Sequence, residues 1–335
     1  SRLKGGDVLI SIKGTIGRVG VVPNGFQGNI SRELARLRIR EDSCAEYIAH
    51  QLEAGATQER IARSVVGTTR LEFSIATLRQ FQLPVPPTKS EQKAIAEALS
   101  DADALIESLE QLLAKKRHLK QGTMQELLTG KKRLPGFSNA WETKQLKDLA
   151  DIRSGGTPST TQPEYWDGDV LWCTPTDITE LNGFKYLTDT SRKISQPGLK
   201  SSSAEVIPAN SVVMTSRATI GECAINKVPV TTNQGFKNFV PFEHVDVEFL
   251  YYLLTTQKQG FITLCGGSTF LEIGKTQLVG YEVQMPDTKD EQTASATVLS
   301  DMDAEIAALE SQLTKTRALK QSIMHKLLTG EIRLI

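Results

Sequence analysis

Three segments of the sequence, at 154–160, 231–235 and 265–269, combine glycine with threonine, serine, asparagine or glutamine. Glycine lets a backbone come close to a ligand, and hydroxyl and amide side chains can hydrogen-bond to phosphate oxygens or base edges. Arg217 and Lys237 stand beside such segments and add positive charge. Each segment taken alone is typical of an ordinary turn, and the neighbouring cations add modest support for nucleic-acid binding.

The search for catalytic motifs is negative. Gly274-Lys275-Thr276 ends like a phosphate loop, but Thr269 stands where the pattern requires its first glycine. There is no G-x-G-x-x-G opening a helix, no Asn/Asp-Pro-Pro-aromatic tetrapeptide, no paired histidine ligands and no nucleophile with its base. Glu272 with Lys275 could be imagined as a nuclease centre, but a solvated ion pair explains them better. We therefore expect no catalytic residue and no metal site.

The composition of the 335 residues is that of ordinary globular domains, with 39% hydrophobic residues and 39 basic against 39 acidic side chains. No apolar stretch approaches the roughly 20 residues that cross a bilayer, and no signal segment opens the sequence. Dispersed cysteines favour a reducing cytosol over disulfides or zinc, so we expect a cytoplasmic protein without a membrane partner. These cysteines are Cys44, Cys173, Cys223 and Cys265.

The net charge of zero is the sum of regions whose net charges differ. Residues 1–89 carry 13 basic and 8 acidic side chains, whereas residues 141–289 carry 13 and 17. Zero net charge therefore does not exclude DNA. It favours a protein that binds DNA weakly by itself or uses partners for phosphate contacts.

An internal repeat organises the chain. Residues 91–134 recur as 291–334 without a gap, with 25 of 44 positions identical. Weaker matches upstream, such as Thr15-Ile16-Gly17 with Thr219-Ile220-Gly221, extend the repeat. A period near 200 is too long for a solenoid of units of about 20–50 residues and indicates a tandem duplication. The first copy lacks a counterpart of about 60–64 residues that follow Trp141, and the sequence starts without Met, as if inside a domain.

The repeated segments predict two long helices, at 90–129 and 290–329, with apolar residues at alternating spacings of three and four. Each helix is acidic in its first half and basic in its second, so an antiparallel pair matches opposite charges and opposes the helix dipoles. We predict an antiparallel coiled coil; the alternative is two amphipathic helices that each pack on their own domain. We also expect a phase shift of the apolar seam toward Leu119 and Leu127, and toward Leu319, Ile323 and Leu327. The predicted seam residues are Leu99, Ile106, Leu109, Leu113, Leu299, Met302, Ile306, Leu309 and Leu313.

The rest of the chain mixes strands and helices. Segments 171–178, 210–221 and 279–286 have strand character, and 247–264 predicts a helix. Residues 1–89 carry a matching back half, with a strand in 6–14 and a helix over 45–63. The fold class expected is α+β: two α/β-mixed domains, the first incomplete at its N-terminal side, joined by the two long helices with pseudo-two-fold symmetry.

This organisation resembles the specificity subunit of type I restriction-modification enzymes. The resemblance rests on Pro84-Val85-Pro86-Pro87 with Glu91-Gln92, on Pro286 with Glu291-Gln292, and on the LKQ and LLTG motifs that close both repeats. The segments 153–172, 216–221, 232–236 and 266–273 look like a target recognition domain of that family. The first copy has Gly28-Asn29-Ile30-Ser31-Arg32 where the second has 232–236, so a different base preference is expected.

The resemblance implies a non-catalytic subunit that reads a bipartite site in double-stranded DNA. Its expected partners are two methyltransferase subunits, which use S-adenosylmethionine, and restriction/translocase subunits, which use ATP and Mg²⁺; the chain itself needs no cofactor. The expected domains are a partial recognition domain (1–89), a helical region (90–134), a linker (135–140), a second recognition domain (141–289) and a second helical region (290–335). The alternatives are a stand-alone DNA methyltransferase or nuclease, and a purely structural coiled-coil adapter.

The candidate DNA-binding residues lie in the polar loops of both copies. They are Lys13, Thr15, Arg18, Asn29, Arg32, Thr69, Arg70, Gly156, Thr157, Ser159, Thr174, Ser216, Arg217, Thr219, Asn233, Gln234, Lys237, Ser268, Thr269 and Lys275.

Overall fold

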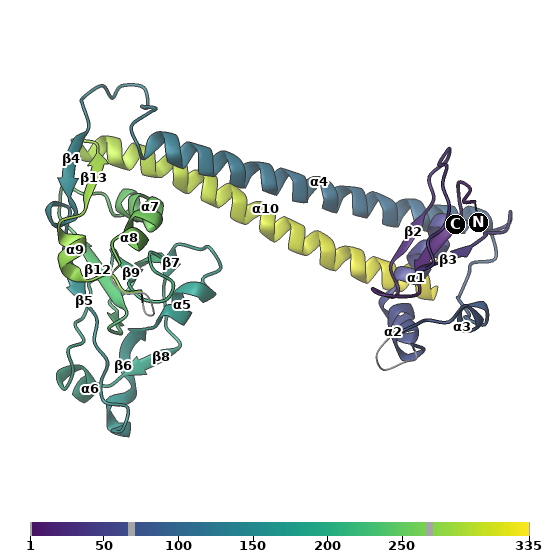
Figure 1. The fold of residues 1–335 in the computed structure, drawn as a ribbon, viewed down its shortest axis with the longest axis horizontal. Helices are drawn as coiled ribbons and strands as arrows, with labels where there is room; N and C mark the ends of the chain where they lie inside the picture. Colours follow the sequence, from purple (N-terminus) through teal and green to yellow (C-terminus); the bar gives the residue numbers. More distant parts are fainter. Residues whose placement is uncertain (1, 66–70, 266–270, 335) are drawn as a thin grey trace. The chain divides into compact units, whose positions relative to one another are not determined.

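The computed structural model describes residues 2–65, 71–265 and 271–334. The chain divides into two compact units (Figure 1): unit 1 is Ser1–Lys115 with Ala307–Ile335, and unit 2 is Lys116–Ile306. The division cuts both long helices, so each unit contains part of each. The domain boundaries expected from the sequence follow the helix ends instead and remain predictions.

Unit 1 has a small antiparallel sheet in the order β2-β1-β3, followed by short helices. Its apolar core joins this sheet and α1 to the first turns of α4 and the last turns of α10. Its elements are β1 Val8–Ser11, β2 Val19–Val21, β3 Leu34–Leu37, α1 Ala45–Glu53, α2 Gly55–Arg63, α3 Ile75–Arg79, and its share of α4 Lys89–Leu127 and α10 Lys289–Thr329.

Unit 2 contains a five-stranded sheet in the order β5-β12-β9-β10-β7, a three-stranded sheet β11-β6-β8 and the pair β13-β4. The helix α7 packs on β9 and β10, and its apolar face fills the main core. The elements are β4 Glu142–Gln145, η1 Leu146–Asp148, β5 Ala150–Ser154, η2 Pro163–Tyr165, β6 Trp166–Cys173, α5 Pro175–Glu180, β7 Tyr186–Leu187, β8 Arg192–Ile194, α6 Gln196–Lys200, β9 Ser211–Thr215, β10 Cys223–Asn226, β11 Thr231–Thr232, β12 Phe236–Pro241, α7 Val247–Thr256, α8 Lys258–Thr263, α9 Lys275–Val279 and β13 Glu282–Met285.

Three expected elements have other bounds than the sequence suggested, and strand β6 starts and ends five residues earlier than the expected 171–178. Strand β6 ends at Cys173 because Thr174 and Asp177 form a capping box that starts α5, with Pro175 in its first turn. The helix expected over 247–264 is divided into α7 and α8 at Gln257. The helix expected over 45–63 is likewise divided, because Ala54 leaves the helical region with ψ 136°.

The antiparallel pairing of the long helices is confirmed within each unit. In unit 1, Arg317 Nη2 lies 2.5 Å from Glu110 Oε1, and Lys320 pairs with Asp103. In unit 2, Lys116 Nζ lies 2.6 Å from Glu305 Oε2, and Lys120 pairs with Asp303. In both units, rising numbers on α4 meet falling numbers on α10, as the charge pattern requires. Figure 1 shows the two helices in blue and yellow.

The predicted seam residues are buried or half-buried, with Leu99 and Leu299 both fully buried. The predicted phase shift is wrong for three residues, because Leu119, Leu319 and Ile323 are 47%, 60% and 38% exposed. The seam instead keeps its spacing through half-buried lysines, whose methylene stems can pack while their ammonium groups reach the carboxylates of the other helix. These lysines are Lys116, Lys120 and Lys320.

The Glu-Gln pair at the start of each long helix connects three elements. Glu91 binds Arg333 beyond the end of α10, and Glu291 binds Arg133 beyond the end of α4. The hydrogen bond from Arg333 lowers the pKa of Glu91 below its ordinary value. The adjacent glutamine accepts a hydrogen bond from the backbone N–H of the residue just before α1 or α7. Gln92 accepts from Cys44 at 2.8 Å, and Gln292 accepts from Asp246 at 2.9 Å.

We expect Gln292→Ala to destabilise the protein by about 1–3 kcal/mol, because the partly buried backbone N–H of Asp246 loses its acceptor and the buried side chain of Gln292 is removed. The measurement is thermal unfolding followed by circular dichroism. Gln312→Ala is the matched control, since Gln312 is exposed on the same helix. Equal unfolding midpoints for the two variants would contradict the assigned role.

Candidate nucleic-acid interface

Four loops of unit 2 converge where β5, β6 and β9 end and where β11 turns into β12. The backbone N–H of Gly156 donates to Thr232 O at 2.9 Å, and that of Ser216 donates to Gly235 O at 2.7 Å. The N–H of Asn233 donates to Cys173 O at 3.1 Å. The structure therefore brings together most of the candidate residues that the sequence placed in separate segments of this copy.

Glycine is required where these loops meet. A Cβ on Gly155 would lie 2.0 Å from Asn233 O, and one on Gly156 would lie 2.3 Å from Ala204 N. Both contacts are with backbone atoms, which cannot move aside as the end of a side chain can. The glycines at 155–156 are explained by packing between loops rather than by the approach of a ligand.

The exposed part of this loop cluster is polar. The hydroxyl of Thr157 donates a hydrogen bond to Oε1 of Gln234, which lies on a different loop. Ser159, Thr219 and Gln234 are exposed, and Thr157 and Asn233 are half-buried. These side chains offer both donors and acceptors to a ligand at the surface.

Arg217 is an exposed cation of this surface, with 46% of its side chain accessible. Its guanidinium lies 2.9 Å from the carboxylate of Glu272, and the two residues also form a backbone bridge. Glu272 therefore holds Arg217 in place and offsets part of its charge.

Several candidate residues support the loops from within. Ser216 is fully buried and Lys237 is 5% exposed, with Lys237 Nζ 3.5 Å from Ser216 Oγ and 3.3 Å from Phe236 O. Burial lowers the pKa of Lys237. Gly156 is buried, and the hydroxyl of Thr174 donates to Asp177 at 2.7 Å. These residues shape the surface from beneath rather than lying exposed on it.

Lys275 is the first residue of α9, which contacts β5. It lines a cleft of about 590 Å³ together with acidic, basic and small residues. The other lining residues are Asp151, Arg153, Ser154, Gly155, Ser203 and Glu205. Because Gly155 belongs to both, this cleft adjoins the loop cluster, with two carboxylates beside its cations.

Unit 1 repeats part of this arrangement. Lys13 Nζ lies 3.4 Å from Glu72 Oε1, and these residues form a backbone bridge as Arg217 and Glu272 do. The candidate side chains Thr15, Arg18, Asn29 and Arg32 are exposed. The candidates Thr69, Arg70, Ser268 and Thr269 lie outside the described residues.

Sequence reasoning missed an aromatic and cationic group in unit 2. The guanidinium of Arg192 lies 4.0 Å from the ring centre of Trp166 and 5.1 Å from that of Trp172. Arg192 is exposed, and the two indoles pack edge to face. The sequence feature that could have pointed to this group is the pair of tryptophans, Trp166 and Trp172, in one segment. Their contact with β8, however, depends on strand pairing that no local pattern specifies.

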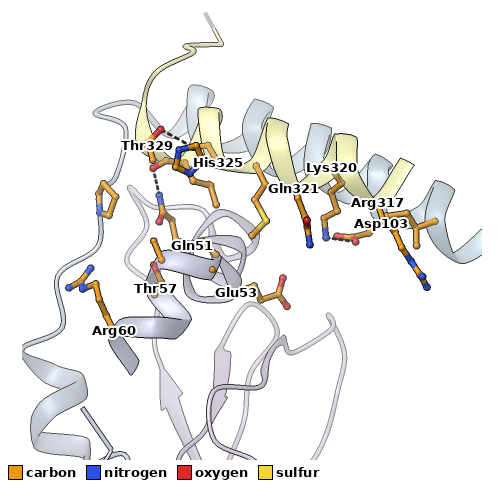
Figure 2. Close-up of a pocket in the computed structure, with 17 residues that line it drawn as sticks. Gln51, Glu53, Thr57, Arg60, Asp103, Arg317, Lys320, Gln321, His325 and Thr329 are labelled. Carbon is orange, nitrogen blue, oxygen red and sulfur yellow. Dashed lines mark hydrogen bonds and ion pairs between the residues drawn. The ribbon is translucent and has the colours of Figure 1, made fainter. Parts of the chain in front are cut away.

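A separate cavity of about 670 Å³ lies in unit 1 between α2 and the helix pair (Figure 2). Gln51 donates to Leu328 O at 2.8 Å at one end, and Asp103 pairs with Lys320 at the other. Among the described residues, no group of three or more histidine, cysteine, aspartate or glutamate side chains is placed to hold a metal ion. The lining of the cavity combines apolar side chains with charged and amide groups.

Within the described parts of the chain, no helix is both long and apolar enough to cross a membrane.

Comparison with known proteins places these features in a family. The sequence model of the type I restriction modification DNA specificity domain matches residues 1–115 and 139–316. The type I restriction enzyme MjaIX specificity subunit of Methanocaldococcus jannaschii is 40% identical over 165 residues, 49% of this chain and 38% of that protein. The MjaVIII specificity subunit of the same organism is 27% identical over 98% of this chain and 79% of its own length. The first of these matches spans well under half of the relative.

The fold agrees with solved structures. The type I restriction-modification S subunit from M. genitalium superposes with a TM-score of 0.64 at 17% identity, covering 97% of this chain and 83% of that one. The HsdS subunit from Thermoanaerobacter tengcongensis superposes with a TM-score of 0.53 at 19% identity, covering 99% and 82%. With the family match over both repeats, this chain belongs to the type I restriction modification DNA specificity domain family.

Proposed function

We propose that this chain is the DNA sequence-specificity subunit of a type I restriction-modification complex. The observation that carries the proposal is the repeated surface pair of a cation and a glutamate, Arg217 with Glu272 and Lys13 with Glu72, beside polar loops in the two units. Each cation can contact a phosphate or a base edge, and each glutamate fixes its direction. Two such surfaces fit a DNA site in two parts.

The two surfaces differ in ways that favour different half-sites. The turn of unit 2 presents Asn233 and Gln234, whereas the matching stretch of unit 1 presents Asn29 and Arg32. The basic excess in 1–89 favours stronger phosphate contacts by unit 1. Arg192 adds a second cation that can contact a phosphate. The ring of Trp166, on which its guanidinium stacks, holds this side chain in position.

We propose that catalysis belongs to partner subunits. Two modification subunits would supply S-adenosylmethionine chemistry, and restriction subunits would supply ATP- and Mg²⁺-dependent cleavage. A docking surface is suggested by two exposed leucines seven residues apart on the part of α4 that belongs to unit 1: Leu105 and Leu112 are 49% and 40% exposed. Exposed apolar residues in a heptad row suit packing against another helix.

The decisive experiment is sequencing of methylated sites in bacterial cells that produce this chain with modification subunits. We expect one asymmetric, split sequence to be methylated, and its loss when this chain is omitted. Methylation at the same sites without the chain would overturn the proposal. Tight binding of S-adenosylmethionine or Mg²⁺ by the isolated chain would favour the stand-alone enzyme, and absence of any sequence preference in the complex would favour a structural adapter.

We expect Arg217→Ala to weaken DNA binding by the complex about 5- to 150-fold, since a side chain that reads a base or phosphate is worth roughly 1–3 kcal/mol. The measurement is a binding titration on DNA carrying the methylated site. Glu272→Gln is the matched control, because it removes the opposing charge and leaves the arginine, and we expect its affinity to be equal or higher. Unchanged affinity for Arg217→Ala, in a protein with an unchanged unfolding midpoint, would reject the contact.

A further inference from the structure

Ala218 has a strained backbone in the loop that joins β9 to β10, directly after Arg217. Its φ angle is 56°, in the left-handed region that residues with a Cβ seldom adopt. Among the described residues, the others with positive φ are glycines or have the short polar side chains that tolerate this conformation. The latter are Asp167, Asn182 and Asn210.

The loop between β1 and β2 in unit 1 has the same conformation. In each loop the hydroxyl of the last strand residue, Ser11 or Thr215, donates to the carbonyl four residues further on. The N–H six residues further on donates back to the carbonyl of that strand residue, at 2.9 Å in both units. The equivalent of Ala218 is then Gly14, with a φ angle of 68°. The conformation suits glycine, and unit 2 carries a methyl group there instead.

The chain around Ala218 holds this conformation in place. The backbone N–H of Ser216 donates to Gly235 O at 2.7 Å, and its carbonyl accepts from Ile273 N–H at 3.1 Å. Arg217 is fixed in turn by its ion pair with a glutamate. Left-handed backbone at a residue other than glycine persists where the surrounding structure fixes it, and it is concentrated at sites that contact ligands.

The methyl group of Ala218 gains no packing in return for this strain. Ala218 is exposed, as are its neighbours Arg217 and Thr219. Glycine would relieve the strained φ angle without uncovering any buried apolar surface. A role for this methyl group therefore lies in contact with a bound ligand rather than in the stability of the fold.

The loop cluster of unit 2 is the surface proposed above to read DNA, and Ala218 stands between two of its exposed candidate residues. Thymine is the base that presents a methyl group in the major groove, and alanine is one of the side chains that make apolar contact with it. The methyl group of Ala218 thus matches the apolar part of one particular base edge.

We propose that Ala218 is a specificity-determining residue, whose methyl group contacts the 5-methyl group of a thymine in the half-site that unit 2 reads. The inference rests on the proposed function and adds a base contact to it. Unit 1 has no methyl group at the equivalent position, because Gly14 occupies it. The two half-sites therefore differ in this contact.

The test uses the complex of the full chain with modification subunits and DNA that carries the methylated site. Each thymine of the site is replaced in turn by uracil, which lacks only the 5-methyl group. We expect one replacement to weaken binding by the parent complex about 3- to 10-fold, the range for losing one buried methyl contact. The Ala218→Gly complex should bind thymine and uracil equally at that position.

The outcomes separate this inference from the proposed function. Sequence-specific binding that tolerates uracil at every thymine would overturn the role of Ala218 and leave the proposed function intact. The same follows if Ala218→Gly still discriminates uracil from thymine as the parent does. A complex without any sequence-dependent binding would remove the proposed function, and this inference with it.

Thermal unfolding distinguishes a base contact from a structural role. Ala218→Gly should keep the unfolding midpoint of the parent or raise it by up to about 4 °C, because glycine relieves the strain. Gly14→Ala is the matched reverse change: its Cβ would meet no atom within 4 Å, so strain alone should lower the midpoint by about 2–6 °C. A lower midpoint for Ala218→Gly would show that the methyl group supports the fold, and would refute the proposal.

Discussion

The double variant Arg317→Glu and Lys320→Glu is expected to unfold at a temperature roughly 5–15 °C below that of the parent chain. Each glutamate would stand beside a carboxylate of the opposite helix, Glu110 or Asp103. The side chain of Lys320 is 17% exposed, so this position is less screened than an ordinary surface pair. Losing both attractions and adding two repulsions should cost about 2–4 kcal/mol, between the values for exposed and buried pairs.

Lys315→Glu is the control for this change in net charge, because Lys315 is exposed on the same helix. We expect it to shift the unfolding midpoint by no more than about 2 °C. Swapping the pair, with Asp103→Lys and Lys320→Asp in one chain, should recover most of the stability lost by Lys320→Asp alone. Equal midpoints for the parent and the double variant, or no recovery by the swap, would contradict a stabilising role for charge matching.

The long helices were predictable because their signals are local and repeated. The absence of proline, the apolar spacing and the division of charge all occur within a single stretch of sequence and then occur again 200 residues later. The phase shift was mispredicted because leucine was assumed to mark the seam. At Lys120 and Lys320 the seam instead contains lysines, because an aspartate of the opposite helix is within reach.

The candidate interface was only partly predictable. The polar segments and Arg217 could be found from residue type, and the structure brings these segments together. The burial of Lys237 could not be predicted, because a lysine just after a polar segment carries no local sign that it lies in a buried strand, here β12. The stacking of Arg192 on Trp166 also depends on the pairing of β6 with β8, which the local sequence does not specify.

The role of the Glu-Gln motif became clear only from the structure. The family resemblance pointed to positions 91–92 and 291–292 but gave these residues no structural role. In the structure the glutamate binds the arginine that follows the opposite helix, and the glutamine accepts the N–H that precedes α1 or α7. The motif therefore fixes the junction of each helix pair with its own core.

Inserting one heptad into both long helices is expected to change the spacer of the DNA site. Seven residues add about 10.5 Å to a helix, and a base pair rises about 3.4 Å, so the half-sites should move apart by roughly three base pairs. A heptad preserves the face that each helix presents, so the antiparallel seam should continue through the insertion. The measurement is sequencing of methylated sites in cells that produce the altered chain with modification subunits.

The control is the same insertion in α10 alone. It leaves α4 unchanged, so the pairs beyond the insertion, such as Arg317 with Glu110, can no longer all form. We expect this chain to lose stability and to lose methylation rather than acquire a longer spacer. If the double insertion yields a stable chain that methylates the original site, the helices do not set the spacer. If it methylates both half-sequences at the wider spacing, the bases read depend on the loop clusters and their separation depends on the helix pair, because the insertion alters no residue of either cluster.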